Sequence, residues 1–401
     1  METFDLPEKF KNWIKTKKWV LRSHQIEVLR NSHRQSQLLI APTGSGKTLS
    51  GFLPTLIELN SVEFSGLHTI YISPLKALAS DIKRNLMVPI EEMELNIRVE
   101  DRTGDTKAVT KRRQRVDPPH ILLTTPESLA LLVSFPESKA LFANLERIVI
   151  DEIHALTETK RGHQLVLAIS RLQSLCKNLR KIGLSATVDR PKEIAGFITE
   201  KEGSCPIIFA APSPDPDISM LQTKSSPPWS GAGGKYAVPD VLEQISNHKT
   251  TLIFHNTRAQ AEIFFHNLWL NNNKNLPVAI HHGSLDFEQR KRVEAAITNG
   301  ELRAIVCTGT LDLGIDWNHV DLVIQVGAPK NIKRLVQRIG RANHTYNAPS
   351  KAIIVPANKF EIIECQAALE AVKDRDLDGE AVRPGSLDVL CQHILLVACS
   401  G

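Results

Sequence analysis

The chain has 401 residues, of which 42% are hydrophobic and 23% charged, and its formal net charge is +5. A chain of this length exceeds what one hydrophobic core usually serves, so we expect two or three domains. No segment approaches the roughly 18 consecutive apolar residues of a membrane helix, and the first residues, METFDLPEKFKNW, lack the apolar core of a signal peptide. The composition therefore predicts a cytoplasmic protein without a membrane partner, and the mild positive charge permits a polyanionic one.

Six cysteines are scattered along the chain, and no two of them form a CxxC pair. This spacing argues against a zinc site or an iron–sulfur cluster and indicates reduced, buried thiols.

Short apolar runs rich in β-branched residues alternate with helical patterns, which is typical of parallel α/β layers. We expect strands at 37–41, 68–73, 120–124, 147–151 and 181–185 in the first half, and at 250–254, 278–281, 304–307, 322–325 and 352–355 in the second. Residues 212–234 between the halves are rich in Pro, Ser and Gly and predict a connector. We therefore expect a first α/β domain at 1–205, a linker at 206–235, a second α/β domain at 236–380, and a further segment at 381–401 whose helical pattern predicts that the natural protein continues.

A phosphate-binding loop is predicted at residues 41–48, APTGSGKT, because this segment follows an apolar strand and opens a helical pattern. Its glycines let backbone N–H groups approach phosphates, and the start of the helix favours negative charge. Lys47 is expected to neutralise the β- and γ-phosphates of a nucleoside triphosphate, and the Thr48 hydroxyl to bind Mg²⁺. The remaining loop positions expected around the phosphates are Thr43, Gly44, Ser45 and Gly46.

Two acidic residues end the apolar strand RIVI, in the string Asp151-Glu152-Ile153-His154. Beside a phosphate loop, Asp151 is suited to hold Mg²⁺ and Glu152 to orient and deprotonate an attacking water. Upstream of the loop, the amide of Gln25 both donates and accepts, so it is a candidate to bind the adenine edge, although a solvated helix glutamine remains the alternative.

Two arginines in the second half, Arg338 and Arg341 of QRIGRANH, are three positions apart and can project from one helix face. Arginines that reach a transferring phosphoryl group contribute roughly 10³–10⁵ in rate, whereas surface salt bridges are the alternative interpretation. The string TGTLDLGIDW (308–317) contains Gly314 and Asp316, which are candidates for contacts to the ribose and the hinge between the domains.

With these blocks in order, the chain resembles superfamily 2 helicases over nearly its whole length. The resemblance extends to SPLKALASD (73–81), RTGDT (102–106), TTPESL (124–129), SAT (185–187), FHNTRAQAE (254–262) and HHGSL (281–285). The strings VCTGTLDLGIDW, QVGAPK and QRIGRANH are most similar to the Lhr (large helicase-related) family, in particular its bacterial ligase-associated DEXH-box branch.

This resemblance implies two tandem RecA-like domains followed by a winged helix, whose start matches SLDVLCQHILLVACSG. It implies an ATP-dependent DNA helicase or translocase that uses Mg²⁺ and moves 3′ to 5′ on single-stranded DNA, or on DNA with a 3′ single-stranded tail, in DNA repair. A DNA ligase and a nuclease of the same pathway are the protein partners that it implies.

The resemblance also implies a track for the nucleic-acid backbone and a link between that track and the ATP site. The track residues that it implies are Lys76, Arg102, Thr103, Thr125 and Ser128 in the first domain and Thr257, Arg258, Thr308 and Thr310 in the second. His154, Ser185 and Thr187 are expected to couple the two sites. The basic run at Lys111, Arg112, Arg113 and Arg115 is more consistent with a solvated helix face than with part of the track.

Two positions depart from the pattern of the superfamily. His344 stands where many members have a third arginine, so the finger role rests mainly on Arg341, and Gly309 stands where relatives often have serine. His281 and His282 have no third ligand at metal-binding spacing and are expected at the end of a strand.

Three alternatives to a DNA helicase remain open from the residues. An RNA helicase would share the same motor, because contacts to phosphates do not distinguish the sugar. A small-molecule kinase leaves the second α/β half and its arginines unexplained. A non-catalytic ATP-binding clamp has no need for Lys47, Asp151, Glu152 and Arg341 together.

Overall fold

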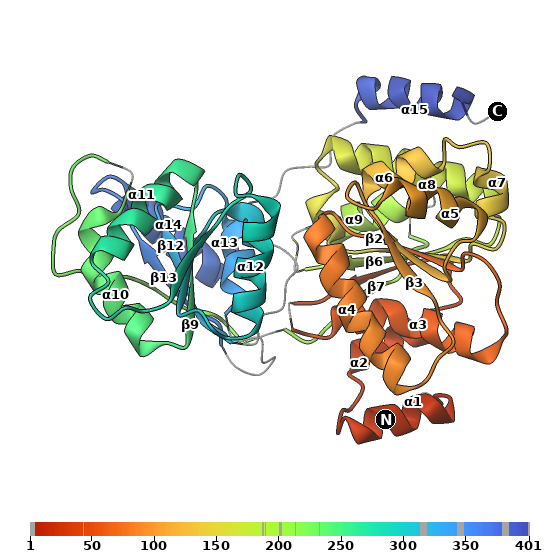
Figure 1. The fold of residues 1–401 in the computed structure, drawn as a ribbon, viewed down its shortest axis with the longest axis horizontal. Coiled ribbons are helices and arrows are strands. Elements are labelled where there is room, and N and C mark those ends of the chain that lie inside the picture. The colour runs from red at the N-terminus through yellow and green to blue at the C-terminus, as the bar shows by residue number, and fades with distance from the viewer. Residues whose placement is uncertain are drawn as a thin grey trace. The chain divides into compact units, whose positions relative to one another are not determined.

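A computed structural model describes residues 5–399 of the chain, except for 43, 187, 189, 200–202, 213, 232, 313–318, 343–348 and 379–384. The chain divides into two compact units. Unit 1 consists of Met1–Pro212 and Glu380–Gly401, and unit 2 of Ser213–Gly379. Each unit has a parallel sheet covered by helices (Figure 1), so the predicted α/β fold class is confirmed.

Unit 1 contains a seven-stranded parallel sheet with the order β3-β4-β2-β5-β6-β1-β7. Its strands are β1 (Ser36–Ile40), β2 (Thr69–Ile72), β3 (Val99–Arg102), β4 (Ile121–Thr124), β5 (Arg147–Ile150), β6 (Arg180–Ser185) and β7 (Ile207–Phe209). The five strands expected from the sequence are all present. The two that were not expected, β3 and β7, are the edge strands, whose short or charged sequences carry little hydrophobic signal.

Helices cover both faces of this sheet and bury alternate strand residues against opposite faces. Leu39, for example, belongs to one core cluster, whereas its neighbours Leu38 and Ile40 belong to the other. The helices of unit 1 are α1 (Glu8–Thr16), α2 (Ser23–Arg30), α3 (Lys47–Ser61), α4 (Lys76–Glu92), α5 (Ala108–Val116), α6 (Pro126–Leu132), α7 (Ser138–Leu141), η1 (Ile153–Ala155), α8 (Lys160–Leu175), α9 (Pro191–Ile198) and α15 (Leu387–Cys399). Residues of α1 to α4 lie in the first cluster and residues of α6 to α9 in the second.

Unit 2 contains a six-stranded parallel sheet with the order β10-β11-β9-β12-β13-β8. Its strands are β8 (Asp217–Met220), β9 (Thr250–His255), β10 (Val278–His281), β11 (Ala304–Cys307), β12 (Val320–Val326) and β13 (Lys351–Val355). Its helices are η2 (Lys235–Ala237), α10 (Val238–Asn247), α11 (Arg258–Leu270), α12 (Phe287–Thr298), η3 (Gly309–Leu311), α13 (Ile332–Ile339) and α14 (Glu361–Asp374). All five strands expected in this half are confirmed.

The segment 206–235, expected as a linker, is partly built into the two sheets. β7 pairs with β1 in unit 1, and β8 pairs with β13 in unit 2. Both are short edge strands that were not expected, because the surrounding Pro, Ser and Gly residues dominate the composition of the segment.

The C-terminal segment contains one described helix, α15, which packs against α8 of unit 1 (Figure 1). Lys160 Nζ lies 2.6 Å from Asp388 Oδ2, and the Ser386 N–H donates to His163 Nδ1 at 3.3 Å. A winged helix that begins here stays a prediction. None of the helices in the described part of the chain has the length and apolar character that a bilayer crossing demands.

Candidate ATP site and nucleic-acid track

The predicted phosphate loop joins β1 to α3 at the carboxyl end of the parallel strands. Gly44 and Gly46 have φ values of 72° and 78°, a left-handed conformation that glycine adopts without strain. A Cβ at Gly46 would also lie 2.8 Å from Nε2 of Gln25. Helix α3 begins at Lys47, within the last two residues of the predicted loop, so its first N–H groups are positioned for an anion. Thr43 lies outside the described residues.

Lys47 and Glu152 form a buried ion pair at this end of the sheet. Lys47 Nζ lies 2.8 Å from Glu152 Oε1, and both side chains are less than a tenth exposed. Glu152 follows β5 in the left-handed region, with φ 46°, which is uncommon for a residue other than glycine. Such backbone strain is concentrated at functional sites. The structure therefore brings the predicted phosphate ligand and the predicted base into contact.

Asp151 lies next to this pair and is fully enclosed. Burial, followed by the charge of Glu152, raises the pKa of Asp151 to about 6, although Lys47 and two hydrogen bonds oppose the shift. These bonds come from the Tyr71 hydroxyl at 2.6 Å and the Glu152 N–H at 2.9 Å. The two carboxylates of Asp151 and Glu152 face one ammonium group, so the site has an excess negative charge that a cation can balance. Asp151 and the hydroxyl of Thr48, on the first turn of α3, are suitable ligands for a hard cation such as Mg²⁺.

Sequence reasoning missed Tyr71, because an aromatic residue in the strand TIYI indicates only a core position. The structure places its hydroxyl on Asp151, and burial, followed by the charge of Asp151, raises the pKa of Tyr71 well above its ordinary value. The phenol therefore stays protonated and donates to the carboxylate.

The predicted contact between His154 and the SAT turn is present. The Ala186 N–H donates to His154 Nδ1 at 3.3 Å, and Ser185 Oγ lies 3.2 Å from the same nitrogen. Because a backbone N–H can only donate, Nδ1 is the acceptor and the proton resides on Nε2, which lies 3.5 Å from Glu152 Oε2. His154 thus joins the turn to Glu152, while Thr187 lies outside the described residues.

Gln25 is buried, which contradicts the alternative of a solvated helix residue. Its Oε1 accepts from the Arg22 N–H at 2.9 Å, and its Nε2 donates to the Gly46 carbonyl at 3.4 Å. Two neighbours also hold the loop: Arg22 Nη1 lies 3.2 Å from the Gly44 carbonyl, and His24 Nε2 3.1 Å from the carbonyl of Ser45. The sequence carried no signal for Arg22 or His24, whose roles depend on how α2 packs.

The two arginines predicted to share a helix face do not share a helix. Arg338 lies on α13, and Arg341 follows the C-cap of that helix at Gly340. Arg338 Nε donates to Asp312 Oδ1 at 2.8 Å and its Nη1 to Gln325 Oε1 at 2.5 Å, so its charge is used within unit 2. Arg341 is also buried, and a contact of Arg341 or Arg338 with a phosphate stays a prediction. Gly314, Asp316 and His344 lie outside the described residues.

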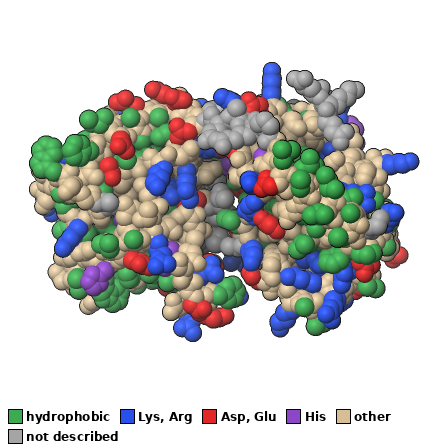
Figure 2. All heavy atoms as spheres, turned by 90° about the horizontal axis from the view of Figure 1, so that it is seen from above, with side chains coloured by type: hydrophobic (Ala, Val, Ile, Leu, Met, Phe, Trp, Pro, Cys, Tyr) green, Lys and Arg blue, Asp and Glu red, His purple; other side chains and the backbone are tan. Residues whose placement is uncertain are grey.

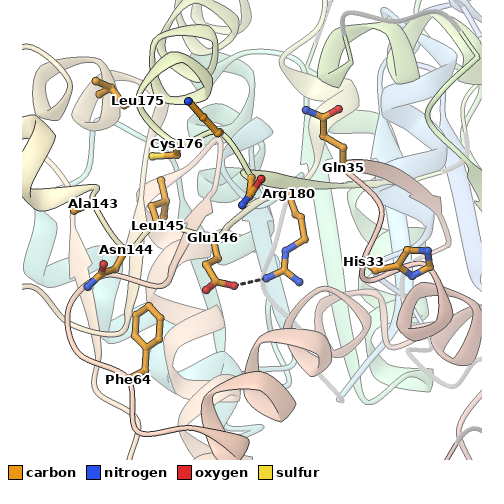
Figure 3. A pocket seen from close by; sticks show the side chains of 12 residues that line it. His33, Gln35, Phe64, Ala143, Asn144, Leu145, Glu146, Leu175, Cys176 and Arg180 are labelled. Carbon is orange, nitrogen blue, oxygen red and sulfur yellow. Dashed lines mark hydrogen bonds and ion pairs between the residues drawn. The ribbon is translucent and has the colours of Figure 1, made fainter.

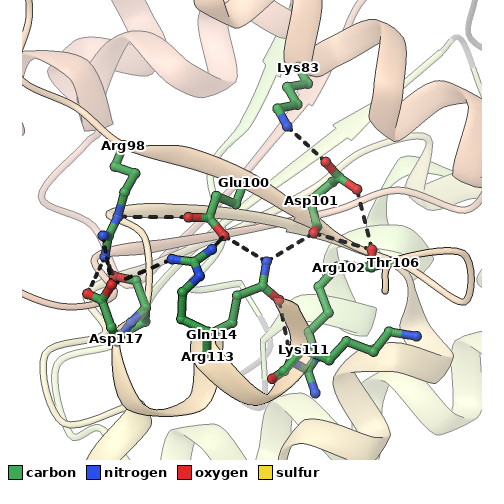
Figure 4. Close-up of polar contacts among 11 residues, drawn as sticks. Lys83, Arg98, Glu100, Asp101, Arg102, Thr106, Lys111, Arg113, Gln114 and Asp117 are labelled. Atoms are coloured by element: carbon green, nitrogen blue, oxygen red, sulfur yellow. Dashed lines mark hydrogen bonds and ion pairs between the residues drawn. The ribbon is translucent and has the colours of Figure 1, made fainter. Parts of the chain in front are cut away.

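Three of the track residues expected in unit 1, Lys76, Arg102 and Thr103, lie in or beside the loop after β3, and Figure 4 shows Arg102 among its neighbours. Arg102 is only 5% exposed, and its Nη1 donates to the Lys111 carbonyl of α5 at 2.6 Å. This corrects the expectation that its guanidinium faces a nucleic acid. Thr103 is also buried, and its backbone N–H donates to Thr106 Oγ1 at 3.0 Å. Lys76, in contrast, is half exposed and lies 2.8 Å from Asp105 Oδ1.

Two of the four basic residues on α5 have acidic partners: Arg113 pairs with Glu100 and Asp117, as Figure 4 shows, and Arg115 lies 3.7 Å from Glu137. Lys111 Nζ donates to the Gly104 carbonyl at 3.0 Å, and Arg115 lies over the ring of Phe135. Arg112 is exposed. These contacts favour the interpretation as a solvated helix face. On the face seen in Figure 2, basic and acidic side chains are interspersed on both units.

The other expected track residues carry hydroxyl groups near the starts of helices. Thr125 caps α6 and its hydroxyl lies 3.2 Å from Ser128 Oγ, and Thr257 caps α11. Thr308 precedes η3, and Thr310 Oγ1 lies 3.0 Å from His281 Nδ1. Arg258 opens α11 and is paired with Glu262, and His281 and His282 are each paired with a glutamate. Among the described residues, neither histidine belongs to a three-ligand group that could hold a metal ion.

A second polar region of unit 1 lies at the amino end of its sheet, opposite the phosphate loop, beside a cavity of about 850 Å³ (Figure 3). Oxygen or nitrogen atoms of Glu58, His68 and Glu146 lie within 4.8 Å of one another there, a spacing suited to a metal ion. Two guanidinium groups already neutralise these carboxylates: Arg147 contacts Glu58 at 2.8 Å, and Arg180 contacts Glu58 at 2.7 Å and Glu146 at 2.6 Å. This region therefore does not fit a metal site.

Comparisons with known proteins agree with this geometry. The family model described as DEAD/DEAH box helicase matches residues 22–194, and that described as helicase conserved C-terminal domain matches residues 236–345. The chain is 37% identical to an ATP-dependent helicase Lhr-Core of Methanothermobacter thermautotrophicus, over 90% of this chain and 45% of the relative. It is 35% identical to ATP-dependent helicase Lhr-Core protein 2 of Thermococcus barophilus, over 98% of this chain and 48% of the relative.

Among solved structures, the chain is similar to Mycobacterium smegmatis helicase Lhr bound to ssDNA and AMP-PNP. The TM-score is 0.89 and the identity 32%, and the match covers 98% of this chain and 53% of that one. The chain thus spans about half the length of the curated relatives that it matches.

Proposed function

This chain belongs to the Lhr family of helicases, and from that premise we propose that it is the motor core of an ATP-dependent DNA helicase or translocase. The observation that carries the proposal is the buried Lys47–Glu152 pair beside Asp151, at the end of a glycine loop. The names of the relatives, which are called ATP-dependent helicases, support the use of ATP.

In this proposal the site exchanges an internal ion pair for a ligand. Lys47 leaves Glu152 for the β- and γ-phosphates of ATP, and Glu152 then accepts a proton from the attacking water. Asp151 and Thr48 hold Mg²⁺, which supplies positive charge to the phosphates when bound. Gln25 binds the adenine, and the N–H groups of the glycine loop hold the phosphates.

In this proposal residues 1–205 and 236–380 are the two motor domains. The second domain supplies the remaining residues of the ATP site. Arg341 stabilises charge on the transferring γ-phosphoryl group, and Gly314 and Asp316 contact the ribose and the hinge. His154 couples ATP turnover to strand movement, because it touches both Glu152 and the Ser185 turn.

The substrate proposed for the track is single-stranded DNA, followed 3′ to 5′ in a DNA repair pathway with a ligase or a nuclease. That the similar M. smegmatis protein was solved with ssDNA supports the choice of DNA. Lys76, Thr125, Ser128, Thr257, Arg258, Thr308 and Thr310 are the proposed contacts. Because most of these are hydroxyl groups, the track needs no large basic patch.

ATP turnover with and without single-stranded DNA tests the proposal, with single-stranded RNA as a third condition. We expect DNA to stimulate turnover and Glu152→Gln to lower the stimulated rate by about 10³-fold, because the water loses its base. Glu91→Gln, the same change on the exposed surface of α4, should leave the rate unchanged. Turnover that survives Glu152→Gln would refute the assigned chemistry, and stimulation by RNA alone would replace DNA with RNA.

A further inference from the structure

Unit 2 contains a cavity of about 340 Å³ between α11 and the loop that follows β10. Its walls include Arg258, Glu262, Phe265, Ile280, His282 and Ser284. Ligand pockets in proteins usually have volumes from about 300 Å³ upward, so the cavity is large enough for one small planar group. It lies beside the first turn of α11, where the proposed track residues Thr257 and Arg258 are located.

The side chain of Glu262 contacts two other polar side chains in the wall of the cavity. Glu262 Oε1 lies 3.2 Å from His282 Nε2 and 3.2 Å from Arg258 Nε. Both partners contact the same oxygen, and the Glu262 side chain is 46% exposed, so the carboxylate is accessible to a ligand. The carboxylate also opposes the entry of a phosphate, although Arg258 lies beside it.

Two further groups suit a nucleobase. The ring of Phe265 lines the cavity and offers a surface on which a base stacks. His282 is 95% buried, and its Nδ1 has no hydrogen-bond partner within the part of the chain that the structure describes. A buried polar atom without a partner is unfavourable, and the His282 ring lies in the wall of the cavity with its Nε2 beside Glu262.

We propose that this cavity takes up one base of the single strand that runs over α11, and that Glu262 selects bases with an exocyclic amino group. This inference rests on the proposed function, since the strand must first be held by the track. It adds a contact with a base to a motor whose proposed track otherwise contacts the phosphate backbone.

The selection follows from the chemistry of the base edges. The N4 amino group of cytosine donates to a carboxylate, a pairing known from protein–DNA recognition. In thymine and uracil a carbonyl oxygen takes the place of that amino group, and it would face the carboxylate and be repelled. Cytosine and thymine have rings of the same size, but thymine carries an additional methyl group, so the edge contact is identified by the loss of the preference when Glu262 is replaced.

The test is the affinity of the 401-residue protein for dC12 and dT12, measured by fluorescence anisotropy at pH 7.5 without nucleotide. We expect dC12 to bind about fivefold more tightly than dT12, as expected for one such contact. Glu262→Gln should remove the preference, because the neutral amide donates as well as accepts. Glu243→Gln, the same charge change on α10, should keep it.

Equal affinities of the unaltered protein for the two oligonucleotides, or a preference that survives Glu262→Gln, would overturn the inference while the proposed function stands. Failure to bind either oligonucleotide would instead refute the track itself. Circular dichroism of each variant shows whether it is folded, and Phe265→Leu provides a second test: it should weaken the binding of both oligonucleotides if the ring stacks on the base.

Discussion

Charged side chains cluster at both ends of the parallel strands in unit 1, and the two clusters differ in how their charges are balanced. At the carboxyl end, Asp151 and Glu152 share the single ammonium of Lys47. At the amino end, the carboxylates of Glu58 and Glu146 face two guanidinium groups, those of Arg147 and Arg180.

The two ends differ in the charge and the hydrogen-bonding groups that remain for a ligand. The carboxyl end has excess negative charge beside a loop of N–H groups, so a cation and phosphates complete it. The amino end is already neutral and hydrogen-bonded, with Arg147 fully buried. A cluster of charged groups therefore marks a functional site only where its charges are not balanced, and the same residue types otherwise stabilise the fold.

A glutamate-to-glutamine substitution at each end should distinguish a cluster that stabilises the fold from one that binds a ligand. The largest loss of stability is expected for Glu58. Glu58→Gln leaves two guanidinium groups with one carboxylate, so we expect the free energy of unfolding to fall by about 3 kcal/mol. Urea denaturation measures this change. ATP turnover per folded molecule should not change, because the network is remote from the phosphate loop. A variant as stable as the unaltered protein would show that the amino end does not stabilise the fold.

His68 provides a pH test of the amino end. Burial, followed by the charge of Arg147, lowers the pKa of His68 to about 4. As the pH falls below the ordinary value of 6.5, the unfolded chain binds the proton and the folded chain does not, so stability is lost in this window. Between pH 7 and pH 5 the loss from this group should be roughly 2 kcal/mol.

Denaturation of His68→Gln at both pH values measures that contribution, since the variant should lose correspondingly less stability on acidification. His266→Gln, at an exposed position on α11, is the matched control and should behave like the unaltered protein. Identical pH dependence in the His68 variant would contradict the assignment.

The smallest expected effect is at the carboxyl end. Glu152→Gln removes one of the two carboxylates beside Lys47, so we expect the unfolding free energy to stay the same or to rise by about 1 kcal/mol, even though turnover is lost. Thermal denaturation of the nucleotide-free protein measures this. A clear loss of stability would show that the carboxyl end, like the amino end, is built primarily for the fold.

Local patterns in the sequence were enough to predict much of this protein. All ten expected strands are present, because each is an apolar run with turn residues on both sides. The phosphate loop, the Asp151–Glu152 pair and the His154–Ser185 contact were predicted because each motif has a chemical requirement that restricts its neighbours. The edge strands β3, β7 and β8 were missed, since an edge strand needs little hydrophobic surface.

Tertiary packing decided which of the expected polar side chains are available to a ligand. Arg102 and Arg338 stand in the expected motifs, yet one is buried against α5 and the other is bound to Asp312. The partners of Arg147 and Tyr71 are about 80 to 90 positions away in the chain. Sequence determines which charges a strand end carries, but only the folded chain determines whether they meet an opposite charge, because that depends on which distant segments the sheet brings together.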